Sequence, residues 1–433
     1  MPDAFSFACT RPPRYRRRLS TLMCLLSDTE PVDPFYQVSA TDLVGEHGDV
    51  IRVRTMSGPA ALESAAACEL VIYQSTRVSD GAPIGVSGII AIPKGDPPVG
   101  GWPVVSWSHG TVGVADRGAP SLDSEELADI GDPTNPPMTI HRKINAAPHM
   151  LLNEFLDRGW AVVMTDYEGL GTRGPHPYLF GTSEGRGVLD IVRAARALHN
   201  RDSAPGEEIV SGRFAIVGHS QGGQAALFAA HLAPSWTAEL ALLAVAAIAP
   251  ASAQERLVML SLLPAGPDLA FLPLAIAGAL ASDPDLATEL EKRVFTPRGL
   301  QLFKDTIDVQ TRVELSEPDS WGALPGRMFF RLLARKPRLT AALKRMHPDL
   351  EIQVPIRISQ AVNDRRVSAA ATRRLWKQLK RRNQTVTVDW VAYDKVAPAD
   401  PASLGDHFGI LTSDVVPLAD WLEREFIGAR ASF

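Results

Sequence analysis

Residues 214–223, Phe-Ala-Ile-Val-Gly-His-Ser-Gln-Gly-Gly, constrain the fold of this 433-residue chain more than any other stretch. The apolar run 214–217 predicts a buried strand, and the residues from Gln221 onward predict a helix. A strand that passes directly into a helix needs a sharp turn with small flanking residues, which Gly218 and Gly222 supply. The stretch therefore predicts that Ser220 lies at the tip of a strained turn. A buried serine in an ordinary glycine-rich turn is the other interpretation.

The segments around this turn alternate between strand and helix patterns. Before residue 102, alternating or apolar runs separated by turn residues predict antiparallel strands at 50–54, 68–73 and 86–92. Beyond residue 102, strands alternate with helices, which is typical of a mostly parallel sheet flanked by helices. These further strands are expected at 103–107, 160–165, 214–217, 240–248, 354–362 and 385–392. The segment 240–248 also fits a helix, and its place after a helix favours a strand.

About a hundred residues interrupt this alternation. Helical patterns broken by prolines fill residues 251–352, and a structureless loop of that length is unusual in a compact domain. We therefore expect an inserted helical cap, with helices at 255–263, 269–281, 286–294, 299–308 and 328–343. The expected organisation is a disordered tail at 1–32, a first core part at 33–250, the cap at 251–352 and a second core part at 353–433.

Composition and the N-terminus bound the class of protein. A net charge of -5 without a long basic stripe argues against nucleic-acid binding, and no stretch is long enough to span a membrane. Arginines at 11–18 precede a short apolar run at 19–26, but no clean cleavage site follows, so cytoplasmic and secreted locations both stay open. Cys9, Cys24 and Cys68 are too few and too irregular for a disulfide framework, although a Cys24–Cys68 bridge stays open, and they do not form a metal-ligand set. We expect no metal or cofactor.

A serine hydroxyl becomes a nucleophile beside a base that is itself oriented by a carboxylate. In an α/β-hydrolase fold the order along the chain is serine, acid, histidine, and the active site lies beyond the carboxyl ends of the strands. Asp364 follows the expected strand 354–362, and His407, in the loop after the last expected strand, is the only histidine beyond Asp364. We therefore expect a triad of Ser220, Asp364 and His407.

Other residues compete for these roles. Asp406 is adjacent to His407, where triad geometry is hard to reach, and Asp394 lies one strand later than Asp364. His347 precedes the acid and breaks the order, as do the other histidines. Asp166 precedes Ser220, and we expect it to hold the neighbouring glycine-rich loop.

Two backbone N–H groups are expected to stabilise the oxyanion of the reaction. One belongs to Gln221, directly after the serine. The other belongs to Gly110 or Thr111, in the His-Gly loop after the first parallel strand. The sequence leaves the choice between these two open.

Taken together, the motifs resemble those of the secretory lipase family, the fungal lipase A type and its actinobacterial relatives. Besides the Asp364 and His407 segments, the resemblance rests on Asp33-Pro-Phe-Tyr36, Trp107-Ser-His-Gly-Thr111, Ala119-Pro-Ser-Leu122, Thr165-Asp-Tyr-Glu-Gly-Leu-Gly-Thr172, His176-Pro-Tyr178 and Gly218-His-Ser-Gln-Gly-Gly223. It implies an α/β-hydrolase core, a helical cap after the serine turn and carboxylic ester hydrolysis. His219 stands where the family often has Tyr, and Gly118 where it often has Cys, which weakens any inference of a secreted, disulfide-bonded form.

The expected function is therefore that of a serine lipase or carboxylesterase that cleaves lipid or other acyl esters through an acyl-enzyme. Acyl transfer on the same triad and a non-catalytic ligand-binding role are the alternatives. The expected partner is a small-molecule or lipid ester, with transient contact to a lipid surface as an option. We expect His176 and Tyr178 to line the substrate pocket. The sequence does not indicate the acyl chain length, the motion of the cap or the oligomeric state.

Overall fold

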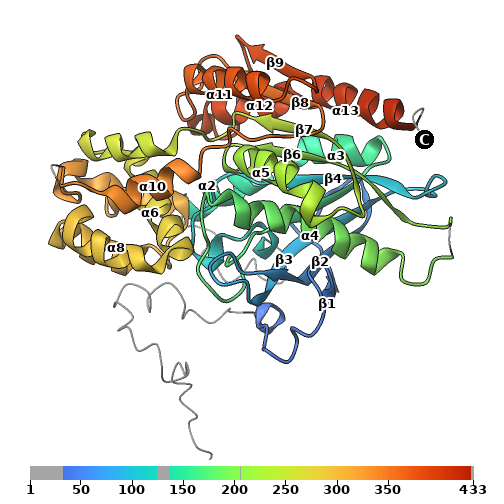
Figure 1. Cartoon of the computed structure of the whole chain (residues 1–433), viewed down its shortest axis with the longest axis horizontal. Helices are drawn as coiled ribbons and strands as arrows, with labels where there is room; N and C mark the ends of the chain where they lie inside the picture. Colours follow the sequence, from blue (N-terminus) through green and yellow to red (C-terminus); the bar gives the residue numbers. More distant parts are fainter. Residues whose placement is uncertain (1–32, 124–135, 205, 333, 431–433) are drawn as a thin grey trace, which may run out of the picture.

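The computed structural model describes residues 33–123, 136–204, 206–332 and 334–430 (Figure 1). The predicted disordered tail at 1–32 lies outside the described residues. A nine-stranded sheet with the order β1-β2-β3-β5-β4-β6-β7-β8-β9 forms the centre. The strands are β1 (Val50–Thr55), β2 (Ala65–Thr76), β3 (Pro83–Pro93), β4 (Trp102–Ser108), β5 (Ala161–Thr165), β6 (Val210–His219), β7 (Ala241–Ile248), β8 (Ile356–Ala361) and β9 (Val388–Tyr393).

The sheet changes from antiparallel to parallel along its width. Strands β1, β2, β3 and β5 pair antiparallel, whereas β5, β4, β6, β7, β8 and β9 pair parallel. This arrangement confirms the predicted fold, a mostly parallel sheet flanked by helices. Segment 241–248 is a strand, as its place after a helix indicated.

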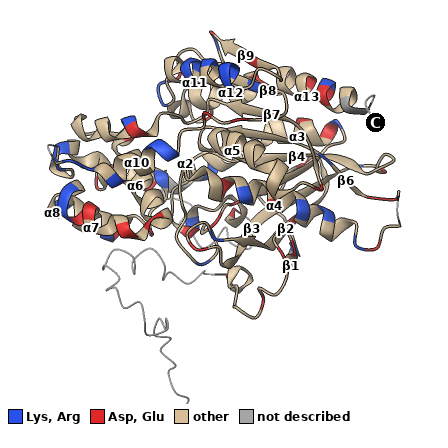
Figure 2. Cartoon of the chain, viewed as in Figure 1, with Lys and Arg blue, Asp and Glu red and all other residues tan. Residues whose placement is uncertain are grey.

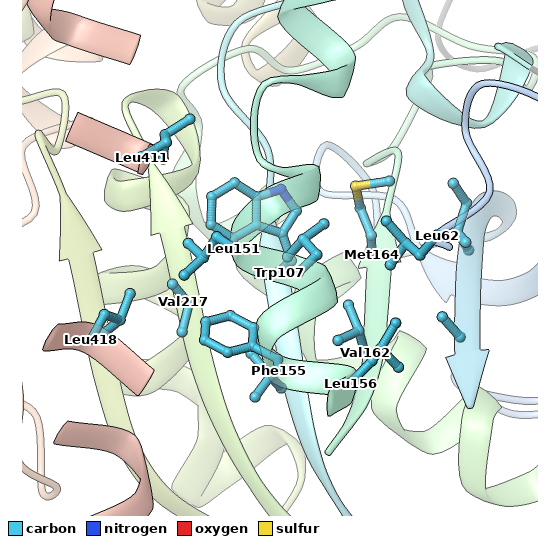
Figure 3. Close-up of a cluster of buried hydrophobic side chains, with 14 of the residues drawn as sticks. Leu62, Trp107, Leu151, Phe155, Leu156, Val162, Met164, Val217, Leu411 and Leu418 are labelled. Carbon is cyan, nitrogen blue, oxygen red and sulfur yellow. The ribbon is translucent and has the colours of Figure 1, made fainter. Parts of the chain in front are cut away.

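Helices cover both faces of the sheet. Neighbouring residues of a strand point to opposite faces, and both faces are apolar, so the sheet has a separate core on each side. Val105 and Val162 pack in one apolar core, and Val104 and Val163 pack in the other. In the first core Phe155 of α3 packs near Trp107 of β4 (Figure 3). The first core is covered by α3 (His149–Asp157), α12 (Asp406–Ser413) and α13 (Val415–Arg430), and the second by α4 (Gly181–His199), α5 (Gln221–Trp236) and α11 (Ala369–Arg382). None of the helices in the described part of the chain is long and apolar enough to cross a membrane.

All described elements between β7 and β8 are helical, and they lie to one side of the sheet (Figure 1). This helical region, which lies where the sequence predicts an inserted cap, is called the cap below. They are η5 (Gln254–Leu262), η6 (Pro267–Ala270), α6 (Phe271–Ser282), η7 (Pro284–Leu286), α7 (Ala287–Glu289), η8 (Leu290–Val294), α8 (Pro297–Thr306), α9 (Arg312–Leu315), η9 (Trp321–Ala323), η10 (Gly326–Met328) and α10 (Pro337–Arg345). They share an apolar core of their own, in which Phe295, Trp321 and Phe330 contact one another.

Two details of the expected helices are wrong. In the range 328–343 expected to be one helix, Met328 ends η10, residues 329–332 are not helical, and α10 begins at Pro337, which suits the first turn of a helix. Helix α2 (Pro136–Ala146) lies where no helix was expected from the sequence.

Candidate active site

Ser220 lies between β6 and α5 in a left-handed backbone conformation, with φ 59° and ψ −116°. A residue other than glycine rarely adopts a backbone conformation with positive φ unless its surroundings enforce it. The Ser220 N–H donates to the Ile248 carbonyl at 2.9 Å. A Cβ on Gly222 would lie 1.8 Å from the Ser108 carbonyl oxygen, and one on Gly218 would lie 2.1 Å from that of Gly222. Both glycines are therefore needed for the turn to form.

Asp364 and His407 meet after β8 and β9. The His407 Nδ1–H donates to Asp364 Oδ2 at 2.7 Å. The other oxygen, Oδ1, accepts from the N–H groups of Arg366 at 2.8 Å and Val367 at 3.0 Å. Burial raises the pKa of Asp364, but the hydrogen bond and charge of His407 and these two N–H donors outweigh it, so the pKa lies below its ordinary value. The carboxylate is therefore ionised and fixes the imidazole orientation.

His407 lies in the first turn of α12 and not in a loop, because that helix begins at Asp406. Among the described residues, Asp364 is the carboxylate that hydrogen-bonds the His407 ring, and Asp406 and Asp394 make no such bond.

Ser220 and His407 line one cavity of about 340 Å³, together with Gly110 and Thr111. The cavity therefore brings together the expected nucleophile, the expected base and both candidate residues of the oxyanion loop. Tyr178 also lines it, whereas His176 does not.

His219 packs directly against His407. Its Nε2–H donates to the His407 carbonyl at 2.8 Å, and the two ring centroids are 4.5 Å apart. Burial, together with the charge of His407, lowers the pKa of His219 well below its ordinary value, so the ring is neutral at pH 7. His219 therefore supports the backbone that carries His407.

The loop after β4 is held from two sides. On the core side, the Tyr167 hydroxyl donates to the His109 carbonyl at 3.0 Å, and burial lowers the pKa of His109 to about 4. On the cap side, the Arg312 N–H donates to the Val112 carbonyl at 2.8 Å, and Gly113 forms a β-bridge with Thr311. The conformation of the predicted oxyanion loop thus depends on α9 of the cap.

Gln221 begins α5, where backbone N–H groups lack intrahelical partners. Gln221 is not among the residues that line the cavity, and its Nε2 donates to Glu184 Oε1 at 2.7 Å and contacts His176 Nε2 at 3.1 Å. Burial raises the pKa of Glu184 to about 8, so this carboxyl group is protonated at pH 7. Glu184 is a residue that the sequence did not indicate, because a glutamate in a first helical turn is ordinary.

Asp166 is fully buried and accepts hydrogen bonds from the hydroxyl groups of Ser87 and Ser121. It lies outside the residues that line the cavity, in agreement with the structural role expected for it. Within the described ranges, no group of three or more His, Cys, Asp or Glu side chains has an arrangement that could hold a metal ion.

Residues 139–312 match the model of the family described as secretory lipase. A search of curated proteins finds no match. Among solved structures, lipase A of Candida antarctica in its closed state gives a TM-score of 0.68 at 20% identity, over 93% of this chain and 87% of that one. The rice cell wall degrading esterase LipA of Xanthomonas oryzae gives 0.67 at 20% identity, over 88% of this chain and 100% of that one. A putative hydrolase of Legionella pneumophila gives 0.63 at 19% identity, over 87% and 98%. At these identities the structural likenesses show the fold, and the family match confirms the resemblance seen in the motifs.

Proposed function

We propose that this chain, whose residues 139–312 are of the secretory lipase type, is a serine carboxylic-ester hydrolase that works through an acyl-enzyme. The family match supports ester hydrolysis. The observation that carries the finer assignment is the 2.7 Å bond between His407 and Asp364 at the wall of the cavity that also holds Ser220.

In the proposed first step the Ser220 hydroxyl attacks the ester carbonyl and His407 takes its proton through Nε2. Asp364 accepts the Nδ1–H of His407 and stabilises the imidazolium that forms. His407 then gives the proton to the leaving alcohol. In the second step a water molecule, deprotonated by His407, attacks the acyl group on Ser220 and releases the acid.

The charge that develops on the carbonyl oxygen needs preorganised donors. The proposed donors are the N–H of Gln221, at the start of α5, and the N–H of Gly110 or Thr111. The Thr111 hydroxyl is hydrogen-bonded to the Tyr178 hydroxyl at 2.8 Å, which restrains this part of the loop.

Part of the cavity wall is apolar and suits an acyl chain. The apolar side chains there are Leu179, Leu257, Leu260, Phe271, Val367 and Phe408. Nearby on the cap, Met259 and Leu262 are 60% and 56% exposed, and we propose that they contact lipid surfaces transiently. Turnover of p-nitrophenyl esters from acetate to palmitate measures the preferred chain length.

The test of the proposal is Ser220→Ala. We expect turnover of p-nitrophenyl butyrate to fall by about 10³-fold or more, since a serine nucleophile has no substitute in this mechanism. A fluorophosphonate probe is expected to label the wild type and not the variant, as mass spectrometry of the intact protein measures. Ser235→Ala, near the end of α5 and exposed, is the matched control and should keep both properties. Retained turnover in Ser220→Ala would contradict the proposal, and an unlabelled wild type would indicate a ligand-binding protein.

A further inference from the structure

The cavity wall contains a buried cation that has no ion-pair partner within the described part of the chain. Arg312, at the start of α9, is 6% exposed and lines the cavity. Among the described residues its guanidinium has no hydrogen bond or ion pair, and its Nε is fully buried without an acceptor. The guanidinium lies over the ring of Phe271, with 5.5 Å between the guanidinium carbon and the ring centroid. Leaving a buried charge unpaired is costly, so the position calls for an anion.

A second residue of the same cavity wall has a buried polar side chain. Gln254, in η5, is 2% exposed and lines the cavity, and neither its Nε2 nor its Oε1 has a hydrogen-bond partner among the residues that the structure describes. The buried hydroxyl of Ser252, also in the wall, is unpartnered as well. Buried amides and hydroxyls in proteins are nearly always hydrogen-bonded, so these groups indicate a polar ligand.

The charges around the cavity have one predominant sign. Among the described residues, its wall contains the cations Arg256, Arg312, Arg365, Arg366 and Arg374 and one acid, Asp268, although the chain as a whole carries a net charge of -5. Figure 2 shows basic residues along α11, which contributes Arg374. Burial, together with the charge of Arg366, lowers the pKa of Arg312 to about 9, so the guanidinium is still cationic at pH 7. The wall therefore attracts and can pair an anion.

We propose that the preferred substrate is an ester that carries a carboxylate or phosphate group besides the ester bond, and that Arg312 and Gln254 bind this group. The inference rests on the proposed ester hydrolysis and specifies its substrate class. A guanidinium matches the two oxygens of a carboxylate or phosphate, and the Gln254 amide adds a further donor. The anionic group sits in the wall while Ser220 reaches the ester carbonyl in the same cavity.

The test compares matched esters. Monoethyl glutarate and ethyl pentanoate differ in one terminal carboxylate on the acyl side, and 3-acetoxypropyl phosphate and propyl acetate differ in one phosphate on the alcohol side. We expect wild-type kcat/KM, followed by acid release in a pH-stat, to favour the charged member of one pair by about tenfold or more, the value of a charge-assisted hydrogen bond. The pair that shows the preference identifies the carboxylate or the phosphate as the ligand.

The variants assign the preference to these residues. Arg312→Met should lower the charged-to-neutral ratio of kcat/KM by about tenfold, Gln254→Leu by a few-fold, and Arg312→Lys should restore part of the ratio. Arg373→Met is the matched control, because Arg373 is exposed on α11 outside the cavity wall, and its ratio should equal that of the wild type. If Arg312→Met does not fold, the wild-type ratio and Gln254→Leu decide.

The inference would be overturned by a wild-type charged-to-neutral ratio of kcat/KM near one for both pairs of esters. It would also be overturned if Gln254→Leu and Arg312→Met, as single variants, both left this ratio unchanged. In that case hydrolysis of ethyl pentanoate that Ser220→Ala abolishes would leave the proposed function standing. Absence of turnover for all four esters, with no fluorophosphonate labelling, would overturn both.

Discussion

At the scale of single residues, each proposed catalytic side chain is fixed by a different kind of contact. Backbone geometry places Ser220, because the turn packs so closely that a Cβ on Gly218 or Gly222 would clash with neighbouring backbone atoms. Hydrogen bonds to two backbone N–H groups place Asp364, and Asp364 in turn orients His407. His219 also restrains His407, because its ring donates a hydrogen bond to the His407 carbonyl. Substitutions at these residues should therefore affect kcat more than substrate affinity.

Asp364→Asn tests the assignment of the acid. An amide in this position favours the wrong tautomer of His407, so we expect kcat to fall by about 10²- to 10⁴-fold with KM little changed. Steady-state kinetics on p-nitrophenyl butyrate measure this effect. Asp406→Asn is the matched control, since it changes the neighbouring carboxylate, and it should keep kcat within about threefold of the wild type. The reverse ranking of the two variants would assign the acid to Asp406.

Glu184 makes the stability of the protein depend on pH. Its pKa in the folded state is about 8, above its ordinary value, so the folded protein keeps a proton that the unfolded chain loses. Below pH about 4.5 the carboxyl group is protonated in both states, so its titration does not lower the free energy of unfolding. As the pH rises from there to about 8, the free energy of unfolding falls by about 1.4 kcal/mol per pH unit. Glu184→Gln removes this titration. We therefore expect the free energy of unfolding in urea, wild type minus variant, to decrease from pH 5 to pH 8, and a constant difference would contradict the pKa.

At the scale of elements, the loop after β4 and α9 of the cap form one unit. The Gly113–Thr311 bridge joins them, and a capping box between Thr311 and Glu314 fixes the start of α9. The cap therefore contributes to the shape of the proposed oxyanion site as well as to the substrate cavity.

Gly113→Ala tests this coupling. Gly113 has φ +125°, and a Cβ there would lie 2.9 Å from the Arg312 nitrogen, so the loop or α9 must shift. We expect kcat/KM to fall by about tenfold or more, and stability to fall by about 1–3 kcal/mol. Gly81→Ala is the matched control: its φ is +76°, and nothing lies within 4 Å of the added Cβ. It should lose stability alone, and equal activity in the two variants would contradict the coupling.

The elements that the sequence predicted are those with a local signal. Alternating and apolar runs located the sheet strands, and the order of serine, acid and histidine singled out Asp364 and His407. Arg312 and Gln254 had no such signal, since both lie in short cap helices whose residues meet the cavity through tertiary packing. The single helix expected at 328–343 was wrong for a similar reason, because Phe329 and Phe330 pack against Trp321 and the helix begins only at Pro337.

At the scale of the whole molecule, a buried ion pair connects β8 to the segment between α12 and α13. Asp414, between α12 and α13, accepts two hydrogen bonds from Arg357 of β8, at 2.8 and 2.6 Å, and one from the Tyr393 hydroxyl at 2.5 Å. Arg357 and Asp414 are 2% and 0% exposed. This cluster joins two strands to the C-terminal helices, near the segment that carries His407.

Removing one partner of this pair should destabilise the fold. We expect Asp414→Asn to lower the free energy of unfolding by about 3–5 kcal/mol, because it leaves the Arg357 charge buried without its counter-charge. Thermal and urea unfolding measure the loss. The double variant Arg357→Met with Asp414→Leu should lose less than the single variant, and a larger loss would show that the pair itself is the main stabilising contribution.

The bridge between Gly113 and Thr311 has a consequence for how such enzymes diverge. A cap acquired by recombination or grafted by design brings a new substrate cavity. It also replaces Thr311, which forms the bridge to Gly113, and the N–H group of residue 312, which donates to the Val112 carbonyl. Only caps that reproduce these backbone contacts should preserve the conformation of the proposed oxyanion loop. Variation in substrate range should therefore accumulate by point changes in the cavity wall, at positions such as 254 and 312, more readily than by exchange of whole caps.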